Sequence, residues 1–179
     1  MSDLAMGPTG AADRRSPVLR PHACFACGEL NVHGMHLQLH VGDGRCTTDL
    51  TLEERFQGWD GIAHGGIITT ILDEVMAWAL LDLDSWGLTA RLTVDFRLPV
   101  PVGRPLHAEG WIVERRRRLT RTQSRLVDAT SGAILAEADA AYIDAPAADR
   151  ERLRRLYEAP ATPTAPAEPA APAQPAGRS

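Results

Sequence analysis

The sequence predicts an α+β domain in which one long apolar helix lies against an antiparallel sheet that curls around it. Three observations lead to this prediction: helical periodicity in the apolar segment 66–83, alternating strand-like segments on both sides of it, and turn residues between those segments. A helix that is apolar on most of its surface must be covered, and a domain this short has few other ways to bury both helix and sheet.

The elements follow in chain order. Residues 35–41 and 45–52 alternate apolar and polar side chains around a Gly-Asp-Gly turn, which predicts a hairpin. The helix is indicated by apolar residues at steps of three and four, namely Ile67, Ile68, Ile71, Leu72, Val75, Met76, Ala79 and Leu80. Strand character returns after Gly87, in four segments at 88–100, 104–117, 120–129 and 133–144. Turn residues separate the segments, with Pro99, Pro101 and Gly103 in one connection and Ser131-Gly132 in another.

Composition divides the chain into three parts. Residues 1–20 are rich in Gly, Ala, Pro and Arg and are expected to form a flexible arm. Residues 21–145 form the predicted domain. Residues 146–179 hold seven of the thirteen Pro, and we expect an Ala/Pro-rich disordered tail there, because so few large apolar side chains cannot offset the ordering entropy. A short helix is predicted over 148–158, where Leu153 and Leu156 share a face.

Charge and hydropathy exclude several classes of protein. All 19 basic residues are Arg, so chemistry that needs a Lys, such as Schiff-base formation or a P-loop, is excluded. The net charge of −4 argues against a nucleic-acid partner. The six Arg within 115–125 are expected to form a solvated strand-and-turn face, with an anionic ligand as the alternative. Without a signal peptide or an apolar run of membrane-spanning length, the chain is expected to be cytoplasmic, with no membrane partner.

The start of the predicted helix is the first candidate site. His64, Gly65 and Gly66 open it. A helix N-terminus offers N–H groups that have no intrahelical partner, and glycine lets a ligand carbonyl approach them. Such donors stabilise the oxyanion of acyl-transfer reactions.

Two carboxylates, Asp73 and Glu74, lie in the middle of the same apolar helix. A carboxylate on a buried element is costly unless it is solvated, paired or used. Asp73 lies on a small-sided face with Gly66, Thr69 and Ala77 and could border a cleft. Glu74 is expected to point to a sheet edge or to solvent, and a surface or salt-bridged carboxylate is the alternative for both residues.

The motifs together resemble a known family. HGGIITTILDEVMAWA is similar to the signature of PaaI-like hotdog thioesterases, in which HGG is followed by an acid nine positions after the His. CFACGELNVHGMHL resembles the CxxCGxxNxxGLxL segment of one branch, and TARLTVDFRLPVPVG resembles the strand after the helix. The resemblance covers about residues 22–144 and implies the hotdog fold, one helix wrapped by a sheet.

The resemblance also implies roles at the site. Asp73 would be the nucleophile, or the general base that activates water against an acyl-CoA thioester. Gly66 with Gly65 would supply N–H groups to the thioester oxygen, and His64 would orient this loop or contact the substrate. Thr89 falls where a hydroxyl would position water.

Other positions differ from the family's motif, or have a role that the resemblance does not decide. Gly58 stands where some relatives carry Asn, so Gln57 is the nearest side-chain amide. Glu74 would be the fallback acid. Two protomers share each site in this family, so a homodimer or a dimer of dimers is implied. With no Lys, the CoA phosphates would be met by Arg, with Arg97 and Arg118 among the candidates.

The expected function is hydrolysis of an acyl-CoA thioester, with an acyl-carrier-protein thioester as the less favoured alternative, and with no cofactor beyond the CoA of the substrate. Two alternatives are a hotdog protein that binds acyl-CoA as a regulator without turnover, and a hotdog hydratase or dehydratase. The sequence contains no GxSxG motif, which argues against an α/β-hydrolase thioesterase.

The three cysteines are expected to be reduced thiols. Cys24 and Cys27 form a CxxC motif that could be half of a zinc site. Against zinc, no second ligand pair follows at a typical spacing, because His33 and His36 come only six and nine residues after Cys27. We therefore predict no metal site and expect the CxxC loop to pack near the substrate channel.

Overall fold

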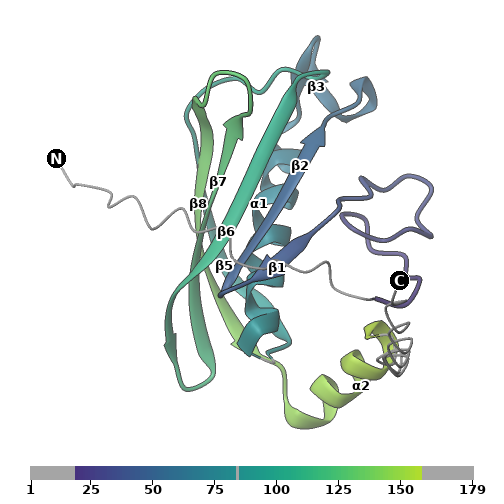
Figure 1. The fold of residues 1–179 in the computed structure, drawn as a ribbon, viewed down its shortest axis with the longest axis vertical. Helices are drawn as coiled ribbons and strands as arrows, with labels where there is room; N and C mark the ends of the chain where they lie inside the picture. Colours follow the sequence, from purple (N-terminus) through teal and green to yellow (C-terminus); the bar gives the residue numbers. More distant parts are fainter. Residues whose placement is uncertain (1–18, 84, 159–179) are drawn as a thin grey trace, which may run out of the picture.

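The computed structural model describes residues 19–83 and 85–158. Six strands form one antiparallel sheet in the order β1-β2-β6-β7-β8-β5, and the helix α1 (Gly65–Ala79) lies against it (Figure 1). The strands are β1 (His40–Gly42), β2 (Arg45–Thr51), β5 (Gly87–Phe96), β6 (Pro105–Arg116), β7 (Leu119–Asp128) and β8 (Ile134–Asp144). The predicted fold class, an antiparallel sheet with one long helix, is confirmed.

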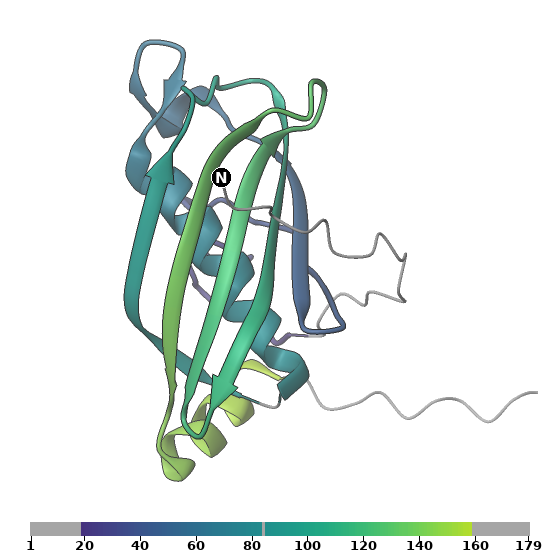
Figure 2. The same ribbon diagram turned by 90° about the vertical axis from the view of Figure 1, so that its left-hand side faces the viewer.

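The core lies between α1 and the sheet, and Figure 2 shows the helix crossing obliquely behind the strands. Ile71, Leu72 and Val75 are completely buried there, as the helical periodicity predicts. At Gly110 of β6 the two elements touch through their backbones, because a Cβ added to this glycine would lie 2.6 Å from the carbonyl carbon of Val75. The absence of a side chain at Gly110 thus allows the helix to lie directly on the sheet.

The first hairpin is present but begins later than predicted. β1 covers only His40–Gly42, and the turn to β2 uses Asp43 and Gly44, both at positive φ. Residues 35–39 do not pair with β2. Instead, the N–H groups of Met35 and Leu37 donate to carbonyls in the CxxC segment, those of Phe25 and Ala26. Hydrogen bonding to the preceding loop thus replaces the first half of the predicted strand.

The segment between β2 and α1 contains structure that the periodicity does not predict. A 3₁₀ turn, η1 (Glu54–Phe56), is followed by the two-stranded hairpin β3 (Gln57–Trp59) and β4 (Ile62–Ala63), which turns at Gly61 with φ +72°. At its other end α1 stops at Ala79, and the predicted extension to residue 83 is the 3₁₀ turn η2 (Leu80–Leu83).

The helix α2 (Ala147–Tyr157) lies within the segment assigned to the tail, at the place where a short helix is predicted. Its last residue, Tyr157, packs against the rings of Trp86 and His22. The remaining parts of the predicted arm and tail, 1–18 and 159–179, lie outside the described residues. Within the described ranges, no helix has the length and apolar character needed to span a bilayer.

Candidate active site

His64 is the N-cap of α1. Its backbone is extended, and its Nδ1 accepts a hydrogen bond of 2.9 Å from the Gly66 N–H. Because Nδ1 is an acceptor, the imidazole is neutral in this arrangement and carries its proton on Nε2. The Gly66 N–H, predicted to face a ligand, is therefore engaged within the chain. It can reach a thioester oxygen only if the His64 ring turns away.

The capping hydrogen bond is expected to contribute to the stability of the protein. Replacing His64 with Ala removes the acceptor of the Gly66 N–H and is expected to lower the free energy of unfolding by about 1 kcal/mol. His64→Asn keeps a side-chain oxygen at the N-cap and should retain most of the stability that His64→Ala loses. Urea denaturation of the two variants and the wild type measures this. An Asn variant as unstable as the Ala variant would show that His64 stabilises the helix by another contact.

Three of the predicted residues, Gln57, His64 and Gly66, line one cavity of about 370 Å³ at the helix start. The Gln57 amide turns into its own hairpin, where Oε1 accepts from the Gly61 N–H at 3.1 Å. Gly58 packs against His64, since an added Cβ would lie 3.1 Å from the His64 Cα. The small β3–β4 hairpin is thus held against the N-cap residue of α1.

Gly65 and Arg97 line a neighbouring cavity of about 350 Å³. The Arg97 guanidinium pairs with Glu137 at 3.0 Å and with Asp95 at 3.7 Å, and about half of the side chain is exposed. Arg97 is therefore a partly neutralised cation beside the first residue of α1.

A second cluster forms around Asp73, in the middle of α1. Its Oδ1 accepts hydrogen bonds from the Tyr142 hydroxyl at 2.6 Å and from the Thr89 hydroxyl at 3.0 Å. The two donors face each other across neighbouring strands, because Thr89 of β5 and Tyr142 of β8 are register partners. Both bonds converge on one oxygen, and the Thr89 hydroxyl also lies 3.4 Å from Oδ2.

Tyr142 was not predicted as a site residue. Its side chain is almost fully buried, and burial together with the nearby Asp73 charge raises the pKa of Tyr142. The phenol therefore stays protonated and donates to the carboxylate. The only signal in the sequence is a lone tyrosine in the Ala-rich strand 136–144.

The two clusters do not meet within one chain. Gly66 and Asp73 are seven residues apart on one helix, which at about 1.5 Å per residue is a separation of about 10 Å along its axis. A carbonyl held at the helix N-terminus is therefore out of reach of the Asp73 carboxylate of the same protomer.

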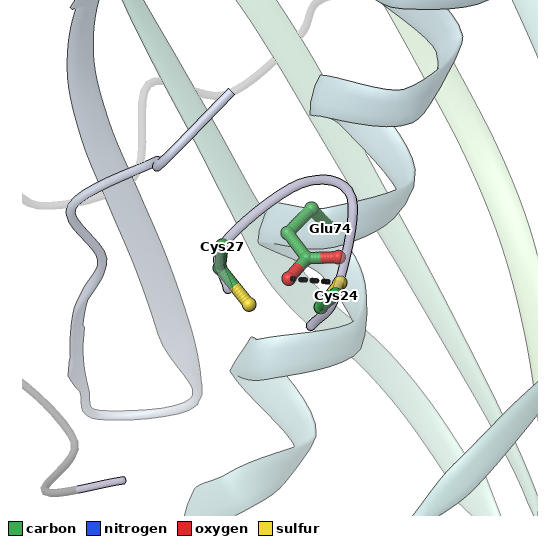
Figure 3. Close-up of side chains that lie close together, drawn as sticks. All are labelled: Cys24, Cys27 and Glu74. Carbon is green, nitrogen blue, oxygen red and sulfur yellow. Dashed lines mark hydrogen bonds between the residues drawn. The ribbon is translucent and has the colours of Figure 1, made fainter. Parts of the chain in front are cut away.

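Glu74 lies elsewhere, and the prediction that it points to a sheet edge or to solvent is wrong. Its Oε1 accepts from the Trp78 Nε1 at 2.8 Å and lies 4.0 Å from the Cys24 Sγ (Figure 3). Burial raises the pKa of Glu74. The next residue along a helix is rotated by about 100°, so Glu74 turns away from Asp73, and the CxxC loop covers it.

The CxxC loop has two unlike thiols. Hydrogen bonds from the Cys27 side chain and from backbone N–H groups lower the pKa of Cys24 to about 5, whereas the hydrogen bond to Cys24 and burial raise the pKa of Cys27. Among the described residues, Cys24, Cys27 and Glu74 are the group with ligand atoms close enough to hold a metal ion. His33 and His36 do not belong to it.

Arg118 lies away from the other predicted site residues. It lies in the turn between β6 and β7 and donates to the backbone carbonyl of Asp144 at 2.9 Å. Nearby, Arg115 pairs with the Asp144 carboxylate and approaches the carbonyl of Leu83, beyond the end of α1. This turn is therefore at the opposite end of the helix from Gly66.

Residues 60–134, which include the helix start, Asp73 and Thr89, match the family model described as thioesterase superfamily. This stretch of the chain is therefore similar to proteins of the thioesterase superfamily. The CxxC segment lies before the matched region. No curated protein matches the chain.

Solved structures of thioesterase-superfamily proteins share the fold. One protein described as a member is 26% identical, with a TM-score of 0.58 over 64% of this chain, and the chain spans only 56% of its length. A Streptococcus mutans protein bound to acetyl-CoA is 16% identical, with a TM-score of 0.59 over 65% of this chain and 94% of its own. A variant of the phenylacetic acid degradation protein PaaI from Thermus thermophilus is 19% identical, with a TM-score of 0.56 over 61% and 93%. The hotdog fold is thereby confirmed.

Proposed function

We propose that the chain hydrolyses an acyl-CoA thioester to a free acid and CoA, with the Asp73 carboxylate as the reacting acid. The observation that carries the proposal is the Asp73 cluster, in which two hydroxyls hold one carboxylate oxygen on a helix of the stretch similar to the thioesterase superfamily. The related Streptococcus mutans protein binds acetyl-CoA, which supports a CoA thioester as the substrate.

In this mechanism the thioester carbonyl lies at the N-terminus of α1, near Gly65 and Gly66. The positive end of the helix dipole and the first-turn N–H groups stabilise the negative charge that develops on the carbonyl oxygen. Asp73 either attacks the carbonyl carbon or takes a proton from the attacking water, and the thiolate of CoA leaves. Water supplies the hydroxyl of the acid and the proton of the thiol.

The distance along α1 requires a second protomer, and β5 offers the surface for it. β5 is a ten-residue edge strand whose side chains are mostly exposed, including Leu88 and Phe96. A long, unpaired edge favours pairing with another strand, and a two-fold axis would pair β5 with its own copy. Such a dimer brings the Asp73 of one protomer toward the helix start of the other.

Arg97 is the candidate of this chain for the CoA phosphates, because it lies beside Gly65 and keeps about half of its side chain exposed. Its planar guanidinium suits phosphate oxygens.

The proposal is tested by thiol release from a series of acyl-CoAs that covers short, medium and long chains and aryl groups. We expect turnover of at least one of them by the wild-type chain. Binding of acyl-CoA without release of thiol from any substrate would contradict hydrolysis and favour a regulatory protein. Hydration of an enoyl-CoA without thiol release would favour a hydratase.

Tyr142 acts through Asp73 as a positioning residue. Tyr142→Phe removes the 2.6 Å hydrogen bond to the carboxylate, a loss of about 1.5 kcal/mol, and is expected to lower kcat about tenfold with little change in KM. Steady-state kinetics separate the two constants. Tyr157→Phe, at the other tyrosine of the chain, is the control and should match the wild type. A Tyr142→Phe variant with a changed KM and an unchanged kcat would show that the phenol contacts substrate instead.

A further inference from the structure

Two thiols and a carboxylate meet where the CxxC loop packs on α1. The Sγ atoms of Cys24 and Cys27 and one carboxylate oxygen of Glu74 all lie within 4.8 Å of one another. Figure 3 shows the three side chains converging, two from the loop and one from the helix. None of the three is needed for the chemistry proposed at Asp73.

The loop is shaped to hold the two thiols close together. The Gly28 N–H donates to the Cys24 carbonyl at 3.0 Å, and the Leu30 N–H donates to the His22 carbonyl at 3.1 Å. A Cβ added at Gly28 would lie 2.3 Å from the Cys24 nitrogen, so the turn accepts only glycine. These contacts hold Cys24 and Cys27 where both sulfur atoms lie close to Glu74.

The Glu74 carboxylate is held in place by a hydrogen bond from its own helix. The Trp78 indole, one helical turn further on, donates to its Oε1 and orients the carboxylate, as outer hydrogen bonds orient metal ligands. No ion pair joins Glu74 to an Arg or His in the described part of the chain. The Glu74 carboxylate is thus held beside the two sulfur atoms of the loop.

We propose that Cys24, Cys27 and Glu74 bind one Zn²⁺ ion per chain. Thiolate and carboxylate oxygen are ordinary zinc ligands. Tetrahedral zinc places sulfur and oxygen ligands about 3.5 Å apart, and the 4.0 Å between the Cys24 Sγ and the Glu74 Oε1 needs only a small closure. Binding releases the Cys27 thiol proton to solvent.

The fourth ligand position is open. All three ligand residues line a cavity of about 240 Å³, whose other walls include Leu153 and Tyr157 of α2. Three protein ligands with one free position are typical of zinc sites that exchange a water or a small ligand, whereas structural sites are closed by four. The CxxC motif is not followed by a second ligand pair of typical spacing, which is why the sequence does not predict this site. Glu74, fifty residues after Cys24, supplies the third ligand from the helix.

Cobalt substitution tests the proposal directly. The untagged full-length chain is reduced, freed of metal with a chelator, and titrated with Co²⁺, which gives a thiolate-to-metal absorption band that histidine sites do not produce. We expect the band to saturate at one Co²⁺ per chain and to be abolished by Zn²⁺. Cys24→Ser and Cys27→Ser should remove the band, and Glu74→Gln should weaken Co²⁺ affinity by at least about tenfold.

Two control variants keep the result specific. Cys46→Ala removes the third thiol, and Asp73→Asn removes the neighbouring carboxylate on the same helix. Both should bind Co²⁺ as the wild type does, with circular dichroism checking the fold of every variant. Absence of the band in a chain whose thiols are shown to be free, or unchanged affinity in Glu74→Gln, would overturn the proposal. So would a Cys24–Cys27 disulfide that forms readily in a chain that binds no Co²⁺ when reduced. These results do not depend on thioester hydrolysis.

Discussion

Replacing Asp73 with Asn is expected to lower kcat for acyl-CoA hydrolysis about a thousandfold, within the range for loss of a reacting acid or base. The amide neither attacks a thioester nor takes a proton from water. It still offers an oxygen to the hydroxyls of Tyr142 and Thr89, so the local structure should remain. Thiol-release kinetics and thermal unfolding of the same preparation measure both effects.

Two other acids serve for comparison. Asp139→Asn removes an exposed carboxylate of β8 that bonds to Gln123, and it should retain wild-type kcat. Glu74→Gln tests whether the adjacent acid, whose side chain points toward the CxxC loop, contributes to kcat. If Asp73→Asn keeps wild-type turnover, the assignment of the reacting acid to Asp73 is wrong. A thousandfold loss in Glu74→Gln alone would move the assignment to Glu74.

The sequence predicts the main elements because they depend on local patterns. The three- and four-residue apolar steps place α1, and alternating residues with turn signals place β6, β7 and β8. The predicted first strand is too long because residues 35–39 bond to the CxxC loop, a contact without a periodic signal. The β3–β4 hairpin is too short to show a pattern.

The candidate site is predicted only in part, because its contacts join residues far apart in the chain. Tyr142 reaches Asp73 across 69 positions, and Glu74 meets Cys24 across 50. Neither pair has a sequence spacing that signals contact. The capping bond from Gly66 to His64 is local, yet it was missed, because histidine is not among the preferred N-cap residues.

Gly66→Val is the second substitution with a large expected effect. A Cβ at Gly66 already lies 3.1 Å from the His64 Nδ1, and the two methyl groups of valine would occupy the space through which a carbonyl approaches the helix start. Blocked access to the N–H donors of the first turn is expected to lower kcat by at least about a hundredfold. The helix should still form, because valine is tolerated in a first turn better than glycine is. Far-ultraviolet circular dichroism checks this, and near wild-type kcat would show that the carbonyl binds elsewhere.

The central claim is that each site combines Asp73 of one protomer with the helix start of another. Mixed dimers of Asp73→Asn and Gly66→Val chains, formed by co-expression, test it most directly. Half of the randomly formed dimers contain both chains, and each of those has one intact site of two, so about a quarter of wild-type activity should return. If both residues of a site came from the same protomer, every site in the mixture would carry one damaged residue. The mixture would then be as inactive as its two components, which would contradict the shared site.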